Sequence, residues 1–274
     1  MQEISQALIV SCAVCSLIEQ MISKKIDQKL IQLGNVHHFI MRFFKELFMP
    51  PYEFKEIINQ CYEVGVKSLP LISLTGFITG IVFTNQSRPS LEDFGATAML
   101  PSLIAIAIVR ALAPLVTALI AAGKVGSNIG AELGSMKVTD QIDAMEVSGT
   151  NPFKFLVVSR VLATTIMSPI LSCYTGFVGL MGSFLNVYQH ESVSFVSFFD
   201  QVFETVTFLD IFQAIIKAGF FGFTIGIVGC FQGYNSSKGT EGVGKAANAA
   251  VVASMFLIFI EEQLVVMIVQ SIRG

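Results

Sequence analysis

The sequence predicts an all-α polytopic membrane protein with about five transmembrane helices. Only 14% of its 274 residues are charged, whereas soluble domains carry roughly 25% charged residues. The mean hydropathy of +0.68 is too high for a soluble domain of this length. Apolar segments that can cross a bilayer core, which takes roughly 20 residues per helix, recur along the chain.

The predicted spans are separated by short polar segments. The third is long enough to tilt or to extend beyond the bilayer. A further apolar run over residues 7–18 is too short to span and predicts an interfacial or packing helix. The five predicted spans are about 65–86, 97–123, 156–187, 208–233 and 247–270.

Two further segments predict amphipathic helices that lie on the membrane surface. In both, apolar residues recur at the helical spacing i, i+3, i+4 and i+7, with charged residues on the other faces. Interfacial anchoring and docking of a partner explain this pattern equally well. The apolar positions are Phe54, Ile57, Ile58 and Cys61 ahead of the first span, and Phe195, Phe198, Phe199, Val202 and Phe203 after the third.

The distribution of Lys and Arg predicts the orientation, because loops on the cytoplasmic side are enriched in both residues. With the N-terminus in the cytoplasm, 13 of the 17 Lys and Arg residues lie in the N-terminal segment and in the 124–160 and 234–246 loops. Arg88 and Arg273 fall on the opposite side. We therefore expect a cytoplasmic N-terminus and a C-terminus on the outer side.

Glycines predict where helices approach one another closely. Gly76 and Gly80 form a G-x-x-x-G pattern in the first span. In the fourth span a stripe of small residues follows one helix face, which lets another helix backbone pack against it. Packing is the favoured interpretation, and a sliding surface is compatible with it. The stripe consists of Gly219, Gly222, Gly226, Gly229 and Gly233.

The sequence contains no recognisable catalytic constellation, so an enzyme is not expected. A net charge of -3 without a basic stripe argues against nucleic-acid binding. Cys12 and Cys15 match C-x-x-C, but no second Cys or His pair lies nearby, so no metal or other cofactor is predicted. Residues 239–245 fit G-x-x-x-x-G-K, yet Ala246 stands where a nucleotide-binding loop needs Ser or Thr.

Charged residues inside spans are the default functional candidates in a membrane protein. They are Arg110 in the second span, Lys217 in the fourth, and Glu261 and Glu262 in the fifth. Arg110 has two interpretations of similar weight: a structural pair with a backbone carbonyl, Glu261 or Glu262, or contact with an anionic headgroup. The surrounding apolar residues suit an apolar cargo better than an ion or a sugar.

The loop between the second and third spans contains a compact acidic helix. Thr139 can cap it, and Gly149 and Pro152 can end it. Carboxylates three residues apart share one side, and Ile142 and Met145 share another. Such a helix suits docking into a groove on a soluble partner, and an ordinary solvated loop helix is the alternative. The carboxylates are those of Asp140, Asp143 and Glu146.

This region also carries a family resemblance. Residues 131–152 and 155–163 closely resemble the signature of the MlaE/YrbE permeases, the membrane subunits of Mce-type ABC transporters that move lipids. The resemblance covers roughly residues 45–271, so it implies a permease domain over 45–274 behind an N-terminal cytoplasmic or interfacial extension over 1–44. The two signature segments are A-E-L-G-S-M-K-V-T-D-Q-I-D-A-M-E-V-S-G-T-N-P and F-L-V-V-S-R-V-L-A. Further matches are F-M-P-P-Y-E-F from residue 48, V-G-V-K-S-L-P-L from 64, F-Q-G-Y from 231 and G-V-G-K-A-A-N-A-A-V-V-A-S from 242.

The resemblance implies that the acidic helix is the coupling helix that sits on a separate ATPase subunit. Glu132 would approach that ATPase together with Asp140, Asp143 and Glu146. The other implied partners are a second copy of the chain, an Mce-domain substrate-binding protein and a small STAS-type subunit, in the inner membrane. The cargo would be phospholipid or a similar amphiphile, in a cavity formed near Phe77, Ile81, Asn85, Gln86 and Arg110.

The sequence departs from the family pattern at one informative position. The family usually shows R-E-L-G-P in the second span, whereas this chain has Arg110, Ala111, Leu112, Ala113 and Pro114. The acid beside Arg110 is therefore missing, which leaves the partner of Arg110 open. Two alternatives to lipid transport also stay open: an ABC permease for a small hydrophobic solute, and a membrane scaffold that transports nothing.

Overall fold

The computed structural model describes residues 34–50, 53–191, 193–237 and 239–273. The chain divides into two compact units, Met1–Met49 and Pro50–Gly274. In the first unit, residues 34–47 are helical; the apolar run over 7–18 and the Cys12–Cys15 motif lie outside the described residues. Every regular element described in the second unit is a helix, so the predicted all-α fold is confirmed.

Five helical segments of the second unit are long and apolar enough to cross a membrane, as predicted. The first consists of α2 (Phe54–Val64), a 3₁₀ turn η1 (Val66–Ser68) and α3 (Leu69–Asp93). Only one face of α2 is packed: Gln60 and Val64 are buried, whereas Phe54 and Ile58 are exposed. An exposed apolar stripe at this position is what interfacial anchoring requires.

The second membrane segment is interrupted by two π-helical turns. It contains η2 (Thr97–Met99), α4 (Leu100–Ala107), η3 (Ile108–Leu112), α5 (Ala113–Ala121), η4 (Ala122–Gly126) and α6 (Ser127–Val138). The turns η3 and η4 are the π-helical ones. A π turn inserts an extra residue into the helix and is frequent at functional sites.

The remaining spans are single long helices. A π-helical stretch, η5 (Phe153–Val158), leads into α8 (Ser159–Glu191), and α10 (Phe208–Tyr234) and α11 (Thr240–Arg273) follow. Gly239 has a φ of 94°, and α11 begins directly after it. The segment that matched G-x-x-x-x-G-K therefore forms the first turns of a helix. Two short helices, α7 (Gln141–Val147) and α9 (Phe195–Thr205), connect the spans.

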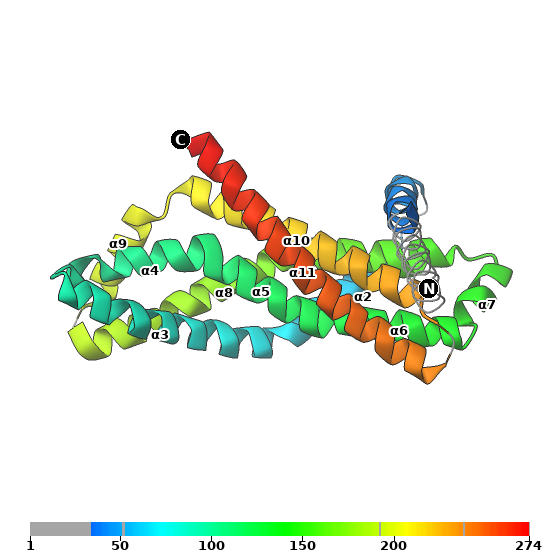
Figure 1. The fold of residues 1–274 in the computed structure, drawn as a ribbon, viewed down its shortest axis with the longest axis horizontal. Coiled ribbons are helices and arrows are strands. Elements are labelled where there is room, and N and C mark those ends of the chain that lie inside the picture. The colour runs from blue at the N-terminus through cyan, green and yellow to red at the C-terminus, as the bar shows by residue number, and fades with distance from the viewer. Residues whose placement is uncertain (1–33, 51–52, 192, 238, 274) are drawn as a thin grey trace, which may run out of the picture. The chain divides into compact units, whose positions relative to one another are not determined.

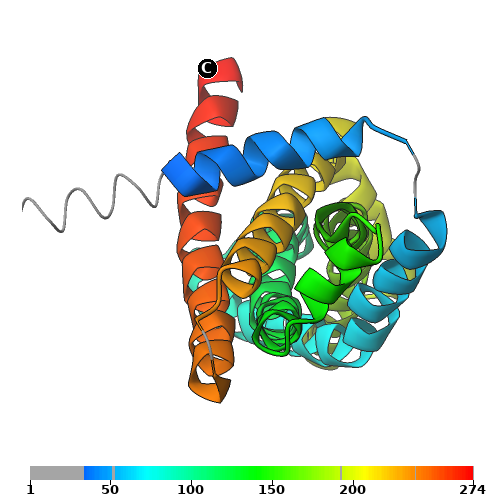
Figure 2. The same ribbon diagram turned by 90° about the vertical axis from the view of Figure 1, so that its right-hand side faces the viewer.

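The second unit is an elongated bundle. In Figure 1, α3, α8 and the helices of the second segment run along the long axis, with α7 at one end and α9 at the other. The helix α11 crosses this bundle diagonally, and its C-terminal part leaves the neighbouring helices. Seen from the α7 end in Figure 2, α11 and α10 form one edge of the unit.

Glycines allow the closest helix contacts, as the sequence indicates. A Cβ on Gly80 of α3 would lie 2.0 Å from the carbonyl oxygen of Gly179 in α8. Such a distance is possible only without a side chain. Because lipid provides no hydrophobic driving force between spans, close backbone approach of this kind is a main source of helix association. The α3–α8 pair is therefore fixed by its glycines.

Candidate functional site

The charged residues of the spans converge on one intramembrane cluster. Arg110, in the π turn η3, forms a two-pronged ion pair with Asp210 of α10: Nε lies 2.8 Å from Oδ1, and an Nη group donates to Oδ2 at 2.9 Å. The side chain of Asp210 is 1% exposed and that of Arg110 is 33% exposed. The same carboxylate caps its own helix by accepting a bond from the backbone N–H of Thr207.

Lys217 of α10 extends the cluster to α11. Its side chain is 1% exposed, and its Nζ donates to Glu262 of α11 at 2.9 Å and to the backbone carbonyl of Arg110 at 2.7 Å. The adjacent Glu261 accepts a bond from the hydroxyl of Thr224. Neither Glu261 nor Glu262 is the partner of Arg110, so the hypothesis that one of them pairs with its side chain is wrong.

Sequence reasoning missed the residue that does pair with Arg110. Asp210 lies two residues into the predicted fourth span, for which the sequence analysis names only Lys217 as a charged residue. Its position three residues after Thr207 is that of a capping box. Arg110 is paired with Asp210 and Lys217 with Glu262, and the third carboxylate, Glu261, is bonded to the hydroxyl of Thr224. The cluster joins the second, fourth and fifth spans through groups whose charges are largely neutralised, which is how ionised side chains persist in a membrane interior.

The carboxylate that pairs with Lys217 comes from another helix. Glu262 of α11 provides the carboxylate for Lys217, directly beside the turn that contains Ala111. A buried lysine without such a partner would be strongly destabilising. The pair of Lys217 and Glu262 therefore links α10 to α11 beside the turn in which this chain has Ala111 instead of the usual acid.

The other residues predicted for a cargo cavity lie on α3. Phe77 and Ile81 are partly buried, and Asn85 and Gln86 are exposed. The carboxamide of Asn85 accepts a bond of 2.9 Å from Asn186 in α8. None of these four residues lines the cavity of about 490 Å³ that lies between α8, α9 and α10. Their role in cargo binding stays a prediction.

The glycine stripe of α10 contacts two different helices. A Cβ at Gly222 or Gly226 would lie 2.4 Å from Thr164 of α8, and at Gly233 it would lie 2.7 Å from Leu133 of α6. Gly229 also faces α6, through Ile129, and Gly219 has only a loose contact with Pro169. The stripe thus seats α10 between α6 and α8.

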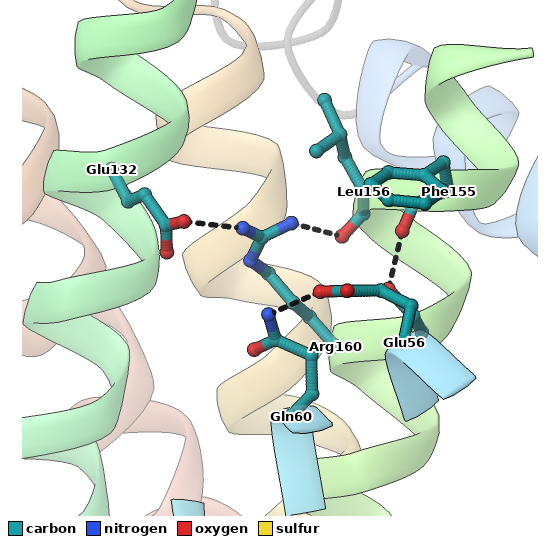
Figure 3. Close-up of polar contacts among 7 residues, drawn as sticks. Glu56, Gln60, Glu132, Phe155, Leu156 and Arg160 are labelled. Atoms are coloured by element: carbon teal, nitrogen blue, oxygen red, sulfur yellow. Dashed lines mark hydrogen bonds and ion pairs between the residues drawn. The ribbon is translucent and has the colours of Figure 1, made fainter. Parts of the chain in front are cut away.

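A second polar cluster lies near α7 (Figure 3). Arg160 of α8 is 2% exposed and donates to the carbonyl oxygen of Leu156 at 2.9 Å and to Glu132 of α6 at 2.7 Å. Gln60 of α2 lies beside this pair in Figure 3, and its amide donates to Glu56. Glu132 therefore holds α6 to α8, a role that the sequence did not suggest.

The acidic helix begins one residue later than predicted. Asp140 has a left-handed backbone with a φ of 56° and occupies the N-cap position of α7, without capping it through its side chain. The hydroxyl of Thr139 instead bonds back to the carbonyl of Ser135 in α6. The prediction that Thr139 caps this helix is wrong, because its side chain completes the preceding helix.

The exposed apolar residue of α7 also differs from the prediction. Ile142 is 1% exposed, so the chain itself buries it and it is unavailable to a partner, whereas Val147 is 91% exposed. Met145 is half-buried, and Asp143 and Glu146 are exposed. Asp143 accepts a bond from Lys137 of α6 at 2.9 Å. The surface of α7 is thus acidic with Val147 as its apolar contact point.

Comparison with known proteins agrees with this architecture. The family Permease MlaE matches residues 57–268. A probable ABC transporter permease protein of Rickettsia bellii is 34% identical over 249 residues, which cover 90% of this chain and 96% of that protein. One from Synechocystis is 35% identical, with 75% and 78% covered.

A plant protein shows the same similarity. The chloroplast protein TRIGALACTOSYLDIACYLGLYCEROL 1 of Arabidopsis thaliana is 32% identical over 208 residues, which cover 76% of this chain and 59% of that protein. The match to the family extends over all five membrane segments. This chain therefore belongs to the MlaE permease family and is an integral membrane permease of the ABC transporter type.

Proposed function

We propose that this permease moves phospholipid or a similar amphiphile, driven by ATP hydrolysis on a separate subunit. The observation that carries the proposal is a charge cluster with a partly exposed guanidinium, Arg110, inside otherwise apolar spans. An amphiphile needs both an apolar path for its chains and a polar group at the depth of its headgroup. The name of the Arabidopsis relative is that of a glycolipid, which supports the same cargo class.

The apolar path is provided by the open faces of the spans. On α3 the exposed residues Leu71, Leu74, Ile78 and Val82 repeat at three or four residues and form one face. Gly80 of this helix lines one small pocket together with Ile108 and Leu112 of the turn η3. The exposed face of α3 and the Arg110 cluster thus belong to neighbouring elements, which favours a common cargo surface.

The proposed partners follow from two further surfaces. The acidic, solvent-exposed α7 with Val147 suits an ATPase subunit, and the sequence resemblance adds an Mce-domain protein and a STAS-type subunit. On α11 a row of exposed apolar residues supports a homodimer. The row consists of Val252, Phe256, Phe259, Ile260, Leu264, Met267 and Ile268. We place the complex in the inner membrane with the N-terminus in the cytoplasm.

Co-purification tests the transporter assignment. The chain is expressed with the products of its neighbouring genes, purified in detergent, and its bound proteins and lipids are identified by mass spectrometry. The Glu146→Arg/Val147→Asp variant should lose the ATPase, whereas Glu204→Arg on α9, at the other end of the unit (Figure 1), should retain it. If no ATPase accompanies the unmodified chain, the scaffold alternative gains and the transporter proposal fails.

Transport by the reconstituted complex tests the cargo. In the Arg110→Gln/Asp210→Asn variant, both charges of the pair disappear together, so no unpaired charge is left in the membrane. We expect it to assemble normally and to transport labelled phospholipid more slowly. Unchanged transport would remove the headgroup role of Arg110. Transport of small hydrophobic solutes without phospholipid transport would favour the alternative cargo.

A further inference from the structure

A large cavity lies away from the α3 face, and its lining residues include chain neighbours of Arg110 and Asp210. It has a volume of about 490 Å³ and is bounded by α8, α9 and α10, together with Val109 and Ala113 of the second segment. Ligand sites commonly enclose roughly 300–1,000 Å³. A methylene group occupies about as much space as a water molecule, on the order of 30 Å³. The cavity therefore has the capacity of one long acyl chain.

The walls of this cavity are almost entirely apolar. The helix α9 contributes the rings of Phe195, Phe199 and Phe203, and α8 contributes Phe177 and Met181. The rings of α9 form a cluster in which Phe199 packs in a tilted arrangement against Phe195, with centroids 4.6 Å apart, and against Phe203. Water does not fill an apolar cavity of this kind stably, because it finds no hydrogen-bond partners there.

The cavity opens toward the surface that the bilayer covers. At its rim, Phe177 of α8, Phe203 of α9 and Ile211 of α10 are 55%, 74% and 42% exposed, respectively. Phe177 and Ile211 belong to membrane spans, so lipid chains are the apolar molecules present at high concentration beside the opening. A dissolved solute would have to cross the bilayer interface to reach it.

The ends of the cavity determine which part of a lipid can occupy it. Asp200 and Glu204 are exposed on α9, as expected of an amphipathic helix that lies at the membrane surface. Arg110 and Asp210 are chain neighbours of the lining residues Val109 and Ile211, but neither of them lines the cavity. The lining therefore contains no charged side chain for a headgroup.

We propose that this cavity binds a single long acyl chain of a membrane lipid, whose headgroup remains at the membrane surface beside α9. None of the α3 residues of the cargo surface proposed above lines this cavity. The same chain chemistry occurs in diacyl phospholipids and in free fatty acids. Both sources fit the site, and the experiment distinguishes them.

Photolabelling tests the proposal on the purified full chain in nanodiscs. One probe is a diacylphosphatidylcholine with a diazirine near the end of one chain, and the other is the corresponding fatty acid. We expect labelling in the α8 peptide that contains residues 172–181. Gly176→Leu fills the cavity from α8, where an added Cβ would meet only Ala113 at 3.6 Å, and Ala214→Phe fills it from α10.

The control variant is Ile170→Phe, which enlarges an exposed residue on the same helix outside the cavity. Both filling variants should reduce labelling of the 172–181 peptide roughly tenfold, because they remove the volume that the chain occupies. The control should leave it unchanged. Thermal melting identifies a variant that does not fold, and the other filling variant then carries the test.

Each outcome decides the proposal. Labelling by the phospholipid probe or by the fatty-acid probe supports it and names the source. Equal labelling of wild type and of the folded filling variants overturns it, because the labelled lipid is then outside the cavity. A cavity that neither probe labels overturns the proposal as well. If Cys173 at the rim then cross-links to a second copy of the chain, the cavity belongs to a protein interface.

Discussion

Truncating Glu262 tests whether the ion pair between α10 and α11 holds these helices together. In the Glu262→Ala variant, the ammonium of Lys217 keeps only the carbonyl of Arg110, at 2.7 Å, while remaining 1% exposed. Removing one partner of a buried ion pair costs about 3–5 kcal/mol. Glu262 itself is 16% exposed, so we expect a loss near the lower limit, about 3 kcal/mol.

The assay is thermal unfolding of the purified chain in detergent, compared across three variants. Glu262→Ala should lower the midpoint strongly. Lys217→Met/Glu262→Leu should restore most of it, because an apolar pair of similar volume replaces both charges without leaving one unpaired. Adding Ala111→Glu to Glu262→Ala should also recover stability, since position 111 directly follows the carbonyl that Lys217 contacts.

Two results would refute this reasoning. A Glu262→Ala midpoint within experimental error of wild type would mean that Lys217 is satisfied without its carboxylate. A double variant as unstable as the single one would mean that the loss comes from packing of α11 rather than from the unpaired charge. A double-mutant cycle over Lys217 and Glu262 separates these two terms.

Three further predictions concern other contacts. Gly226→Ala should destabilise the chain by about 1–3 kcal/mol, since the new Cβ would lie 2.4 Å from Thr164. Gly244→Ala should be tolerated, because a Cβ at this position has nothing within 4 Å. Thermal melting compares the two variants. Ile142→Asp should lower the expression and melting temperature of the chain, and Val147→Asp should weaken only the affinity for the ATPase, as measured in a pull-down. Arg160→Leu should destabilise the contact of α6 with α8 and lower the melting temperature, and an unchanged melting temperature would contradict the role of its bond to Glu132.

Membrane segments and close helix contacts were predictable from sequence because each depends on short-range patterns. A span requires a continuous apolar run, and the five predicted runs lie within the five observed segments. Gly80 predicts a close approach because only a missing side chain permits it. The identity of the neighbour, Gly179, was not predictable, since it follows from how α3 and α8 are arranged in space.

The polar contacts were less predictable because they join residues far apart in sequence. Asp210 lies 100 residues from Arg110, and no local pattern identifies this pair. On α7 the helical spacing correctly indicated an apolar side, but not which apolar residue the chain would bury. Ile142 and Val147 have similar hydrophobicity, and only the contact of α7 with the bundle distinguishes them.

The two polar clusters have different physical roles because they lie in differently packed regions. At the end of the bundle that lies near α7, glycine contacts at Gly222, Gly226 and Gly233 already hold the helices α6, α8 and α10 together. The bond of Arg160 to Glu132 therefore strengthens a rigid block. The C-terminal part of α11 leaves the bundle (Figure 1), and Leu264, Met267 and Ile268 after the two glutamates are exposed. At that point packing contributes little, so the bonds to Thr224 and Lys217 determine where α11 separates from the block.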